Sequence, residues 1–335
     1  MTRGTLKAAF LNENGLSAAP RTPLAGDASS RRYERVADKD RSLVLMDDPS
    51  DTGQSLTAFL HMTAHLRQLN LSAPEIIAVD LPHGFALLED LGDTVFAREV
   101  LRDPTLELPL YLAATELFDP LHHTPPPEGI PHYGPSEMAQ ATDLAFLWYQ
   151  ADMQSVLSAE AKAVMSNLET LLRQLSAPTV LSLRDYHAEN LLWLPDREGP
   201  ARVGLLDYQD AVATHPIYDL VSLICDARRD VHPDIANQCL SHFATMKGMS
   251  TDDTRFAAAL IAVQRNLRIL GIFARLSRQM GKPGYVDLIP RVWRMLLQDL
   301  DHPELSGLKT QLRPLLPDPT PAFLTRLRAP CPTPS

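Results

Sequence analysis

The chain has no excess of positive charge. Among its 335 residues, 31 Lys and Arg stand against 41 Asp and Glu, which gives a formal net charge of −10 at pH 7. Proteins that bind nucleic acids present basic surface to the phosphate backbone. The acidic balance therefore argues against binding DNA or RNA, and we expect no nucleic-acid partner.

Cysteines and long apolar runs are also scarce. The three cysteines, Cys225, Cys239 and Cys331, are odd in number and lack the paired spacing of a metal site. We expect them to be reduced, as in a cytoplasmic protein. No N-terminal run is apolar enough for a signal peptide, and no run approaches the ~18 apolar residues of a membrane span. We therefore expect a cytoplasmic monomer without a membrane partner.

The first ninety residues alternate between short apolar runs and turn residues. This pattern predicts a helix within Met1–Pro20, three strands within Thr22–Asp47, a helix over Gln54–Leu69, and strands over Ile76–Val79 and Gly84–Glu89. After Leu91 most of the pattern is helical. The predicted helices are Thr94–Arg102, Leu108–His122, Gln140–Gln150, Ala159–Leu175, Tyr218–Arg229, Asp234–Met246, Thr251–Met280 and Tyr285–Leu300.

These patterns predict an α+β fold of two lobes. A small N-terminal β-sheet lobe, residues 1–91, would precede a larger and mainly helical lobe, residues 92–313. The chain has 28 prolines, above the usual share of ~5 %. Many lie in loops and at the C-terminus, so we expect residues 314–335 to form a proline-rich tail.

Three polar residues with a regular spacing indicate phosphoryl transfer. Asp185 is followed five positions later by Asn190, and Asp207 ends a later apolar run. Phosphoryl transfer uses one carboxylate to orient the attacking hydroxyl, and amide and carboxylate oxygens to hold Mg²⁺. The kinase catalytic loop has this pattern, H-R-D-x-x-x-x-N with a later Asp. Asp and Asn are also common in ordinary loops. The neighbouring sequence must therefore distinguish a catalytic loop from an ordinary one.

The surrounding pattern favours a catalytic loop. Apolar runs at Val180–Leu183, Leu191–Leu194 and Val203–Leu206 predict short strands, and Pro195–Pro200 predicts the turn of a hairpin between the last two. The polar residues lie between the strands and after the third one. Catalytic groups are typically found on loops that a sheet holds in place.

The nucleotide side of such a site is predicted in the N-terminal lobe. The loop Gly26–Ser30 (GDASS) would let backbone N–H groups approach phosphate, with Gly26 and Ser29 as the candidates. Arg31 and Arg32 follow on the next strand, and alternation puts them on opposite faces. At least one of them could bind phosphate; each could equally belong to a solvated face.

The segment Leu87–Asp93 (LLEDLGD) would join the lobes. An adenine ring could pair with the backbone of Glu89 and Leu91 and lie between apolar side chains. The alternative is a linker whose acidic residues are simply exposed to water. The two alternatives are compatible, because adenine would use backbone groups.

These segments resemble the aminoglycoside phosphotransferase superfamily, which has the protein-kinase-like fold, from about Ala19 to Leu300. The likeness extends to bacterial anomeric sugar kinases that act on N-acetylmuramate and N-acetylglucosamine. It is carried by GDASSRRYERV, LLEDLGD, LRDYHAENLLWL, GLLDYQDA, PIYDLVSL and QRNLRILGIFARL. The resemblance implies ATP and Mg²⁺ as cofactors, Asp185 as the catalytic base, and Asn190 and Asp207 as the Mg²⁺ ligands.

Two departures from the superfamily pattern concern the nucleotide. The third strand usually ends in a lysine that pairs with phosphate, and here Met46 takes that position. The glutamate that usually partners this lysine is missing too, because Thr52–Asn70 contains no Glu. A buried carboxylate without a partner would be costly, so losing both is physically consistent. Phosphate must then be bound by Mg²⁺, by backbone N–H groups, or by Arg31 or Arg32.

The acceptor is predicted to bind beside Asp185. His187 could contact phosphate or substrate or pack against the loop, and Asp210 could reach substrate or a second metal ion or cap a turn. Trp148 and Tyr149 could form an aromatic platform or pack in the core. Arg265 could bind the carboxylate of N-acetylmuramate or form a surface ion pair.

Three functions remain open at this level. The first is an ATP- and Mg²⁺-dependent kinase that phosphorylates the anomeric hydroxyl of an amino sugar, with a sugar 1-phosphate product for cell-wall recycling. The second is a kinase of the same superfamily with another acceptor, such as an aminoglycoside, choline or homoserine. The third is a regulatory nucleotide-binding module without catalysis, which Met46 favours and Asp185 disfavours.

Overall fold

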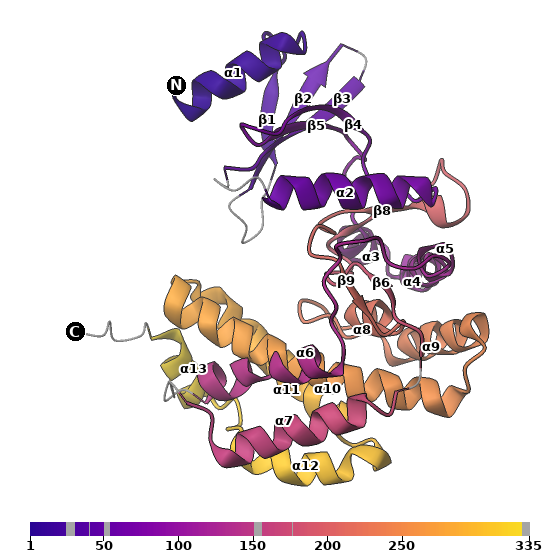
Figure 1. Ribbon diagram of the computed structural model, residues 1–335, viewed down its shortest axis with the longest axis vertical. Coiled ribbons are helices and arrows are strands. Elements are labelled where there is room, and N and C mark those ends of the chain that lie inside the picture. Colours follow the sequence, from indigo (N-terminus) through magenta and orange to yellow (C-terminus); the bar gives the residue numbers. More distant parts are fainter. Residues whose placement is uncertain (25–30, 40, 50–53, 151–155, 176, 330–335) are drawn as a thin grey trace. The chain divides into compact units, whose positions relative to one another are not determined.

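The computed structural model describes residues 1–24, 31–39, 41–49, 54–150, 156–175 and 177–329. The chain divides into two compact units, each built from two stretches of sequence (Figure 1). The first contains Met1–His123 and Ala188–Ala211; the second contains Thr124–His187 and Val212–Ser335. The lobe boundaries at 91/92 and 313/314 rest on the sequence pattern and remain predictions.

The first unit is built around an antiparallel sheet of five strands in the order β1-β2-β3-β5-β4. The strands are β1 Arg21–Leu24, β2 Arg32–Asp38, β3 Arg41–Asp47, β4 Ile76–Asp80 and β5 Phe85–Glu89. β3 is central and pairs with both β2 and β5. The five strands predicted from the N-terminal sequence are therefore all present.

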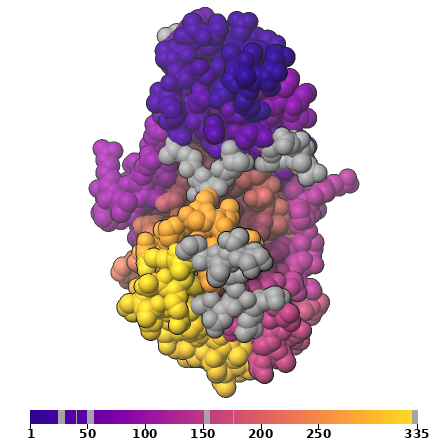
Figure 2. Space-filling model, turned by 90° about the vertical axis from the view of Figure 1, so that its left-hand side faces the viewer, coloured from indigo at the N-terminus to yellow at the C-terminus, as the bar shows by residue number. Residues whose placement is uncertain are grey.

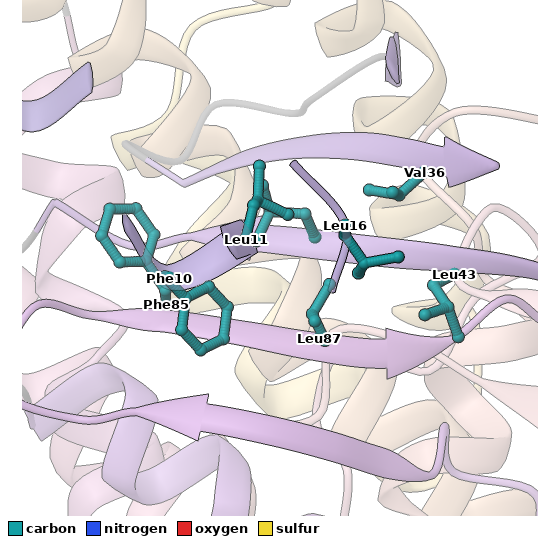
Figure 3. Packing of buried hydrophobic residues seen from close by; sticks show 8 residues of the cluster. Phe10, Leu11, Leu16, Val36, Leu43, Phe85 and Leu87 are labelled. Atoms are coloured by element: carbon teal, nitrogen blue, oxygen red, sulfur yellow. The ribbon is translucent and has the colours of Figure 1, made fainter. Parts of the chain in front are cut away.

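One face of this sheet is covered by helix α1, Arg3–Glu13 (Figure 3). Phe10 and Leu11 of the helix pack with Leu16 and with alternate strand residues of the same face, namely Val36, Leu43, Leu45, Phe85 and Leu87. The rings of Phe10 and Phe85 stack with their centroids 5.7 Å apart. Successive strand residues point to opposite faces, so Val44 and Met46 of β3 point to the other side.

Helix α2, Gln54–Gln68, lies on the side of the sheet away from α1 (Figure 1). Leu56, Phe59 and Leu66 of this helix are buried, whereas Leu60 and Leu69, the residue just after the helix, are half-buried. The helix ends before Asn70, whose left-handed backbone (φ 58°) is typical of a residue just past a helix. α2 contains no acidic residue.

Three helices and a hairpin complete the first unit. The helices are α3 Phe96–Arg102, α4 Glu107–Glu116 and α5 Phe118–Leu121, and the hairpin consists of β7 Leu191–Trp193 and β8 Val203–Leu205. The sequence predicted this hairpin correctly. It predicted a single helix over Leu108–His122, which is wrong because the chain breaks it at Leu117; Pro120 has no N–H to continue the hydrogen-bond ladder.

The second unit is mainly helical. Its helices are α6 Pro135–Gln140, a π-helical turn Ala145–Tyr149, α7 Ala159–Leu172, α8 Tyr218–Ile224, α9 Pro233–Lys247, α10 Thr251–Met280, α11 Ile289–Asp299, α12 Ser306–Leu312 and α13 Pro321–Arg328. A two-stranded sheet pairs β6, Val180–Ser182, with β9, Val212–Thr214. Among the C-terminal helices, yellow in Figure 2, α13 lies against the orange α10, whereas α12 lies against α7.

Helix α10 is by length and composition the one described helix that could cross a membrane. The most apolar window of this helix has a mean hydropathy of 1.4. The sequence analysis expected no run that approaches a membrane span and therefore missed this apolar window. Within the unit 72 % of that window is buried. Burial on all sides is typical of a helix at the core of a globular fold.

Two predicted helices of this unit differ from the structure, and some of its elements were not predicted. The helix predicted over Tyr218–Arg229 stops at Ile224, because the Asp226 carboxylate accepts from the Arg228 backbone N–H (2.8 Å) and forms a local turn. The predicted helix Gln140–Gln150 is replaced by α6 and the π-helical turn. Strand β9 and the helices α12 and α13 were not predicted at all.

Candidate active site

The segment that carries Asp185 follows strand β6 in the second unit. Arg184, directly before Asp185, has φ 69°, a left-handed conformation that is rare for a residue with a side chain. Asp185 is half-buried, and its backbone N–H donates to the Leu183 carbonyl at 2.8 Å. A strained backbone like that of Arg184 persists only where the surrounding structure holds it, and strained residues cluster at functional sites.

Asp219, in helix α8, holds this strained turn. Its carboxylate is 1 % exposed and accepts from the Ser182 hydroxyl at 2.6 Å and from the backbone N–H groups of Leu183 at 2.6 Å and Arg184 at 2.9 Å. A side chain of helix α8 thus bonds the backbone of the loop that carries Asp185. Burial raises the pKa of Asp219 to about 6, and these three hydrogen bonds oppose the increase.

Arg265 of helix α10 supports the same turn from the other side. Its Nη2 donates to the Ser222 hydroxyl at 2.5 Å, and that hydroxyl donates to the Arg184 carbonyl at 3.2 Å. The guanidinium lies 4.7 Å from the centroid of the Tyr218 ring. Burial lowers the pKa of Arg265, but Tyr218, Asp185 and Asp219 raise it overall. Arg265 is therefore a buried cation within the electrostatic reach of Asp185.

His187 lies inside the same loop and is buried. Arg228 donates from Nη1 to its Nε2 at 3.2 Å, which assigns Nε2 as the acceptor. Burial, and then the charges of Arg228 and Arg265, lower the pKa of His187 to about 3. His187 is therefore neutral near pH 7, in a position typical of a packed loop residue.

The two proposed metal ligands belong to the first unit, at one end of the β7–β8 hairpin. Asn190 directly precedes β7, and its carbonyl accepts from the Leu206 backbone N–H at 3.0 Å. Asp207 follows two residues after β8, is exposed, and has φ 55°. Gln209 donates to its Oδ1 at 2.7 Å. The hairpin thus brings the backbone of these two residues to the same end of a paired strand.

This donor set fits Mg²⁺ better than a softer metal. An amide oxygen and a carboxylate are hard ligands, and Mg²⁺ is usually held by one or two protein carboxylates together with phosphate and water. Among the described residues no group of three or more His, Cys, Asp or Glu forms a metal site. A protein-only cage is therefore not found there, whereas a metal shared with a phosphate is compatible with these residues.

Of the predicted phosphate-binding residues, Gly26 and Ser29 lie outside the described residues. Arg31 is 5 % exposed, and its Nε donates to Asp48 Oδ2 at 3.2 Å. Arg32 is exposed on strand β2, opposite Asp47 in the register. The sequence analysis did not single out Asp48, although Asp48 follows Met46 by two positions and alternation would have placed both on one face.

The segment proposed for adenine binding is held by hydrogen bonds within the first unit. The Glu89 backbone N–H donates to the Glu75 carbonyl at 2.8 Å, so adenine pairing at Glu89 would have to use the carbonyl. Among the described residues, Leu91 makes no backbone hydrogen bond. Arg35 binds Asp90 and Asp93 through both carboxylates, with N–O distances of 2.6 to 3.1 Å, and ties strand β2 to this segment.

The remaining predicted substrate residues have different surroundings. Tyr149 is fully buried: its hydroxyl donates to the Pro317 carbonyl at 2.9 Å, and its ring contacts Trp293 and Phe323. These contacts favour the core-packing alternative for Tyr149. Trp148 is half-buried beside it, and Asp210 is exposed after the Asp207 segment.

The chain is similar to known phosphotransferases over most of its length. Residues 21–267 match the model of the phosphotransferase enzyme family. The N-acetylmuramate/N-acetylglucosamine kinase of Caulobacter vibrioides is 36 % identical over 92 % of this chain and 95 % of the relative. The protein of the same name from Pseudomonas aeruginosa is 32 % identical over 85 % of this chain and 86 % of the relative.

Solved structures share the fold at low sequence identity. A choline/ethanolamine kinase family protein from Mesorhizobium loti superimposes with a TM-score of 0.64 at 15 % identity, covering 98 % of this chain and 99 % of that chain. An aminoglycoside phosphotransferase from Streptomyces rimosus, solved with ADP and streptomycin, gives a TM-score of 0.52 at 21 % identity, covering 78 % of this chain and 98 % of that chain. The predicted α+β, protein-kinase-like fold is confirmed.

Proposed function

Since this chain belongs to the phosphotransferase enzyme family, we propose that it is an ATP-dependent kinase for the anomeric hydroxyl of an amino sugar. The acceptor is N-acetylmuramate, N-acetylglucosamine or both, and the product is the sugar 1-phosphate. The observation that carries the proposal is the similarity, over nearly the whole chain, to relatives that bear the names of both sugars. We place the reaction in the cytoplasm.

Asp185 is proposed as the catalytic base. Its carboxylate would orient the sugar hydroxyl and accept its proton as phosphate is transferred. The strained Arg184 backbone, which Asp219 holds in place, supports this assignment, because a base acts well only in a fixed position. Arg265 and Ser222 would help to position the loop.

Asn190 and Asp207 are proposed to hold Mg²⁺ through their side-chain oxygens. When bound, the ion would neutralise charge on the nucleotide phosphates. The proposal rests on their spacing from Asp185, on the hairpin that fixes both residues, and on their hard oxygen ligands. The backbone of Glu89 and Leu91 is proposed for adenine, with the Glu89 carbonyl rather than its N–H as the partner.

The charges near Asp185 favour a neutral or anionic acceptor over a polycation. Arg265 is buried within reach of Asp185, Arg184 precedes it, and Arg228 contacts His187 in the same loop. A polycationic aminoglycoside would be repelled by these guanidinium groups, whereas a carboxylate would be attracted. The hypotheses of an aminoglycoside or choline acceptor are therefore less favourable.

Phosphorus NMR tests the proposal directly. The protein is incubated with ATP and Mg²⁺ and, in separate samples, with N-acetylmuramate, N-acetylglucosamine, choline and an aminoglycoside. We expect a sugar 1-phosphate signal that couples to the anomeric proton and is absent with the Asp185→Asn variant. Transfer to choline or the aminoglycoside alone would reject the sugar but retain the kinase.

A further inference from the structure

The lysine that usually binds nucleotide phosphate in this fold and the glutamate that usually pairs with that lysine are both missing from this chain. Met46 takes the place of the lysine on β3 and is fully buried. Helix α2, which usually supplies a carboxylate to that lysine, has no acidic residue. A different cation is needed to meet the charge of the phosphates.

The register of strands β2 and β3 identifies a replacement pair. Tyr33 lies opposite Met46, and Arg32 lies opposite Asp47. Continuing the register by one pair places Arg31 opposite Asp48, and their side chains form an ion pair of 3.2 Å. Because side chains alternate between faces, Arg31 and Asp48 share the face of Met46.

The opposite face of the same strands packs against helix α1. Asp47 binds Lys7 of helix α1 at 2.8 Å, which places Asp47 on the α1 side of the sheet. Arg32, opposite Asp47, shares that side and is exposed. Of the two arginines that follow the loop, only Arg31 therefore lies on the face where the lysine would be.

The Arg31–Asp48 pair is held firmly in place. Both side chains are almost inaccessible, with 4 % and 1 % exposure. The Asp48 backbone N–H donates to the Gly84 carbonyl at 2.9 Å, and a Cβ on Gly84 would lie 2.2 Å from the Asp48 carbonyl oxygen. The Arg31 guanidinium also lies 6.0 Å from the centroid of the Phe59 ring. A buried ion pair adds little net stability, so this arrangement favours a binding role.

Aromatic rings connect the pair to the segment of the proposed metal ligand Asp207. Burial raises the pKa of the Tyr33 hydroxyl, Arg31 lowers it through its charge and a hydrogen bond, and Asp207 and Asp48 raise it. The charges of Arg31, Asp48 and Asp207 therefore all influence this hydroxyl. Phe59 stacks on Tyr208, the residue after Asp207, with centroids 5.2 Å apart, which connects Arg31 to the Asp207 segment through packed rings.

We propose that Arg31, positioned by Asp48, binds the nucleotide phosphates in place of the missing lysine, beside Asp207. The inference rests on the proposed nucleotide-dependent function. A guanidinium has five N–H donors in a planar fork, so it can bind a carboxylate and a phosphate at the same time. The usual lysine on β3, which pairs with a carboxylate of α2, and Arg31 beside β2 would thus both bind the negatively charged phosphates, but from different strands.

Isothermal titration calorimetry of the full chain with ADP and Mg²⁺, and separately with adenosine, tests the proposal without any acceptor. Arg31→Met should weaken ADP binding about 10-fold to 100-fold, the usual effect of losing a hydrogen bond to a charged group, and leave adenosine affinity unchanged. Arg31→Lys should restore part of the loss. The matched control is Arg41→Met, which breaks an exposed ion pair with Asp38 at the other end of the same hairpin.

A second variant guards against misfolding, because Arg31→Met leaves Asp48 buried without its ion pair. The double variant Arg31→Met/Asp48→Asn removes that charge and should melt closer to the wild type while still binding ADP weakly. Undiminished ADP affinity in both variants, equal losses for ADP and adenosine, or a loss confined to Arg32→Met would each overturn the proposal. A wild type that binds neither ligand would instead reject the proposed function itself.

Discussion

The carboxylate of Asp219 accepts a hydrogen bond of 2.9 Å from the backbone N–H of Arg184, the residue directly before Asp185. The two residues are 35 positions apart in the chain, and the contact fixes a left-handed backbone that would otherwise be unfavourable. It makes Asp219 the residue that determines where the proposed base can lie.

Replacing Asp219 by Asn should therefore lower both stability and turnover. An amide has one acceptor oxygen, and its NH₂ group would face a backbone donor, so a buried N–H loses its partner. We expect a loss of about 1 to 3 kcal/mol in the free energy of unfolding and a fall in kcat of about 10-fold to 100-fold from the misplaced loop. Denaturant unfolding and steady-state kinetics measure the two effects. Ser182→Ala removes the hydroxyl that donates to Asp219 and accepts from the Arg184 N–H at 3.1 Å, but it leaves both backbone bonds of the Asp219 carboxylate, so it should show a smaller change in both.

Replacing Asp185 by Asn should abolish most turnover while preserving the fold. The amide cannot accept the proton of the sugar hydroxyl, and the loss of a general base costs about 100-fold to 10,000-fold in rate. ADP affinity should stay at the wild-type value by calorimetry. Glu189→Gln, which neutralises an exposed carboxylate four residues later in the same loop, is the matched control. A comparable loss in that control would show that the effect is not specific to Asp185.

If Asn190 and Asp207 hold Mg²⁺, replacing either residue should change how the activity depends on the Mg²⁺ concentration. Chelation with EDTA should stop the reaction, and added Mg²⁺ should restore it. Asn190→Ala should raise the Mg²⁺ concentration needed for half-maximal activity, because one oxygen ligand is lost, and Asp207→Asn should have the larger effect because a charge is lost too. Asp196→Asn, in the exposed turn of the same hairpin, should leave the Mg²⁺ dependence as in the wild type. Wild-type Mg²⁺ curves in both Asn190→Ala and Asp207→Asn would contradict the assignment.

Because His187 is buried as a neutral ring, we expect the folded protein to lose stability in acid. Its pKa is lowered to about 3 in the folded protein, below the ~6.5 of an unfolded chain. The neutral ring therefore contributes stability that is present above about pH 6.5 and is lost as the pH falls towards 3. The slope from this residue is at most about 1.4 kcal/mol per pH unit.

Urea unfolding at several pH values measures this slope. His187→Gln, which keeps polarity but does not titrate in this range, should unfold with a shallower dependence on pH between 6.5 and 4. Half-buried His215 has a pKa lowered to about 4 by desolvation and should retain its own contribution in that variant. An identical slope in wild type and variant would mean that His187 is accessible to protons in the folded state.

The elements with strong local signals could be predicted from the sequence. Helix α10 was predicted with its observed bounds, because Ser250 caps its start and Gly281, with φ 66°, ends it. The hairpin after Asn190 was predicted from two apolar runs around a turn. Elements without such signals were missed, such as the three-residue strand β9, which exists because β6 supplies its partner.

The sequence by itself determined the class of fold and the proposed catalytic triad of Asp185, Asn190 and Asp207, because spacing and local patterning are properties of neighbours along the chain. The tertiary structure decided which distant groups serve them. Asp219 reaches the Arg184 backbone, Arg31 pairs with Asp48 across two strands, and Tyr149 is buried among rings of other helices. Register, burial and the conformation of the Arg184 turn depend on contacts between segments far apart in sequence, and no local pattern specifies those contacts.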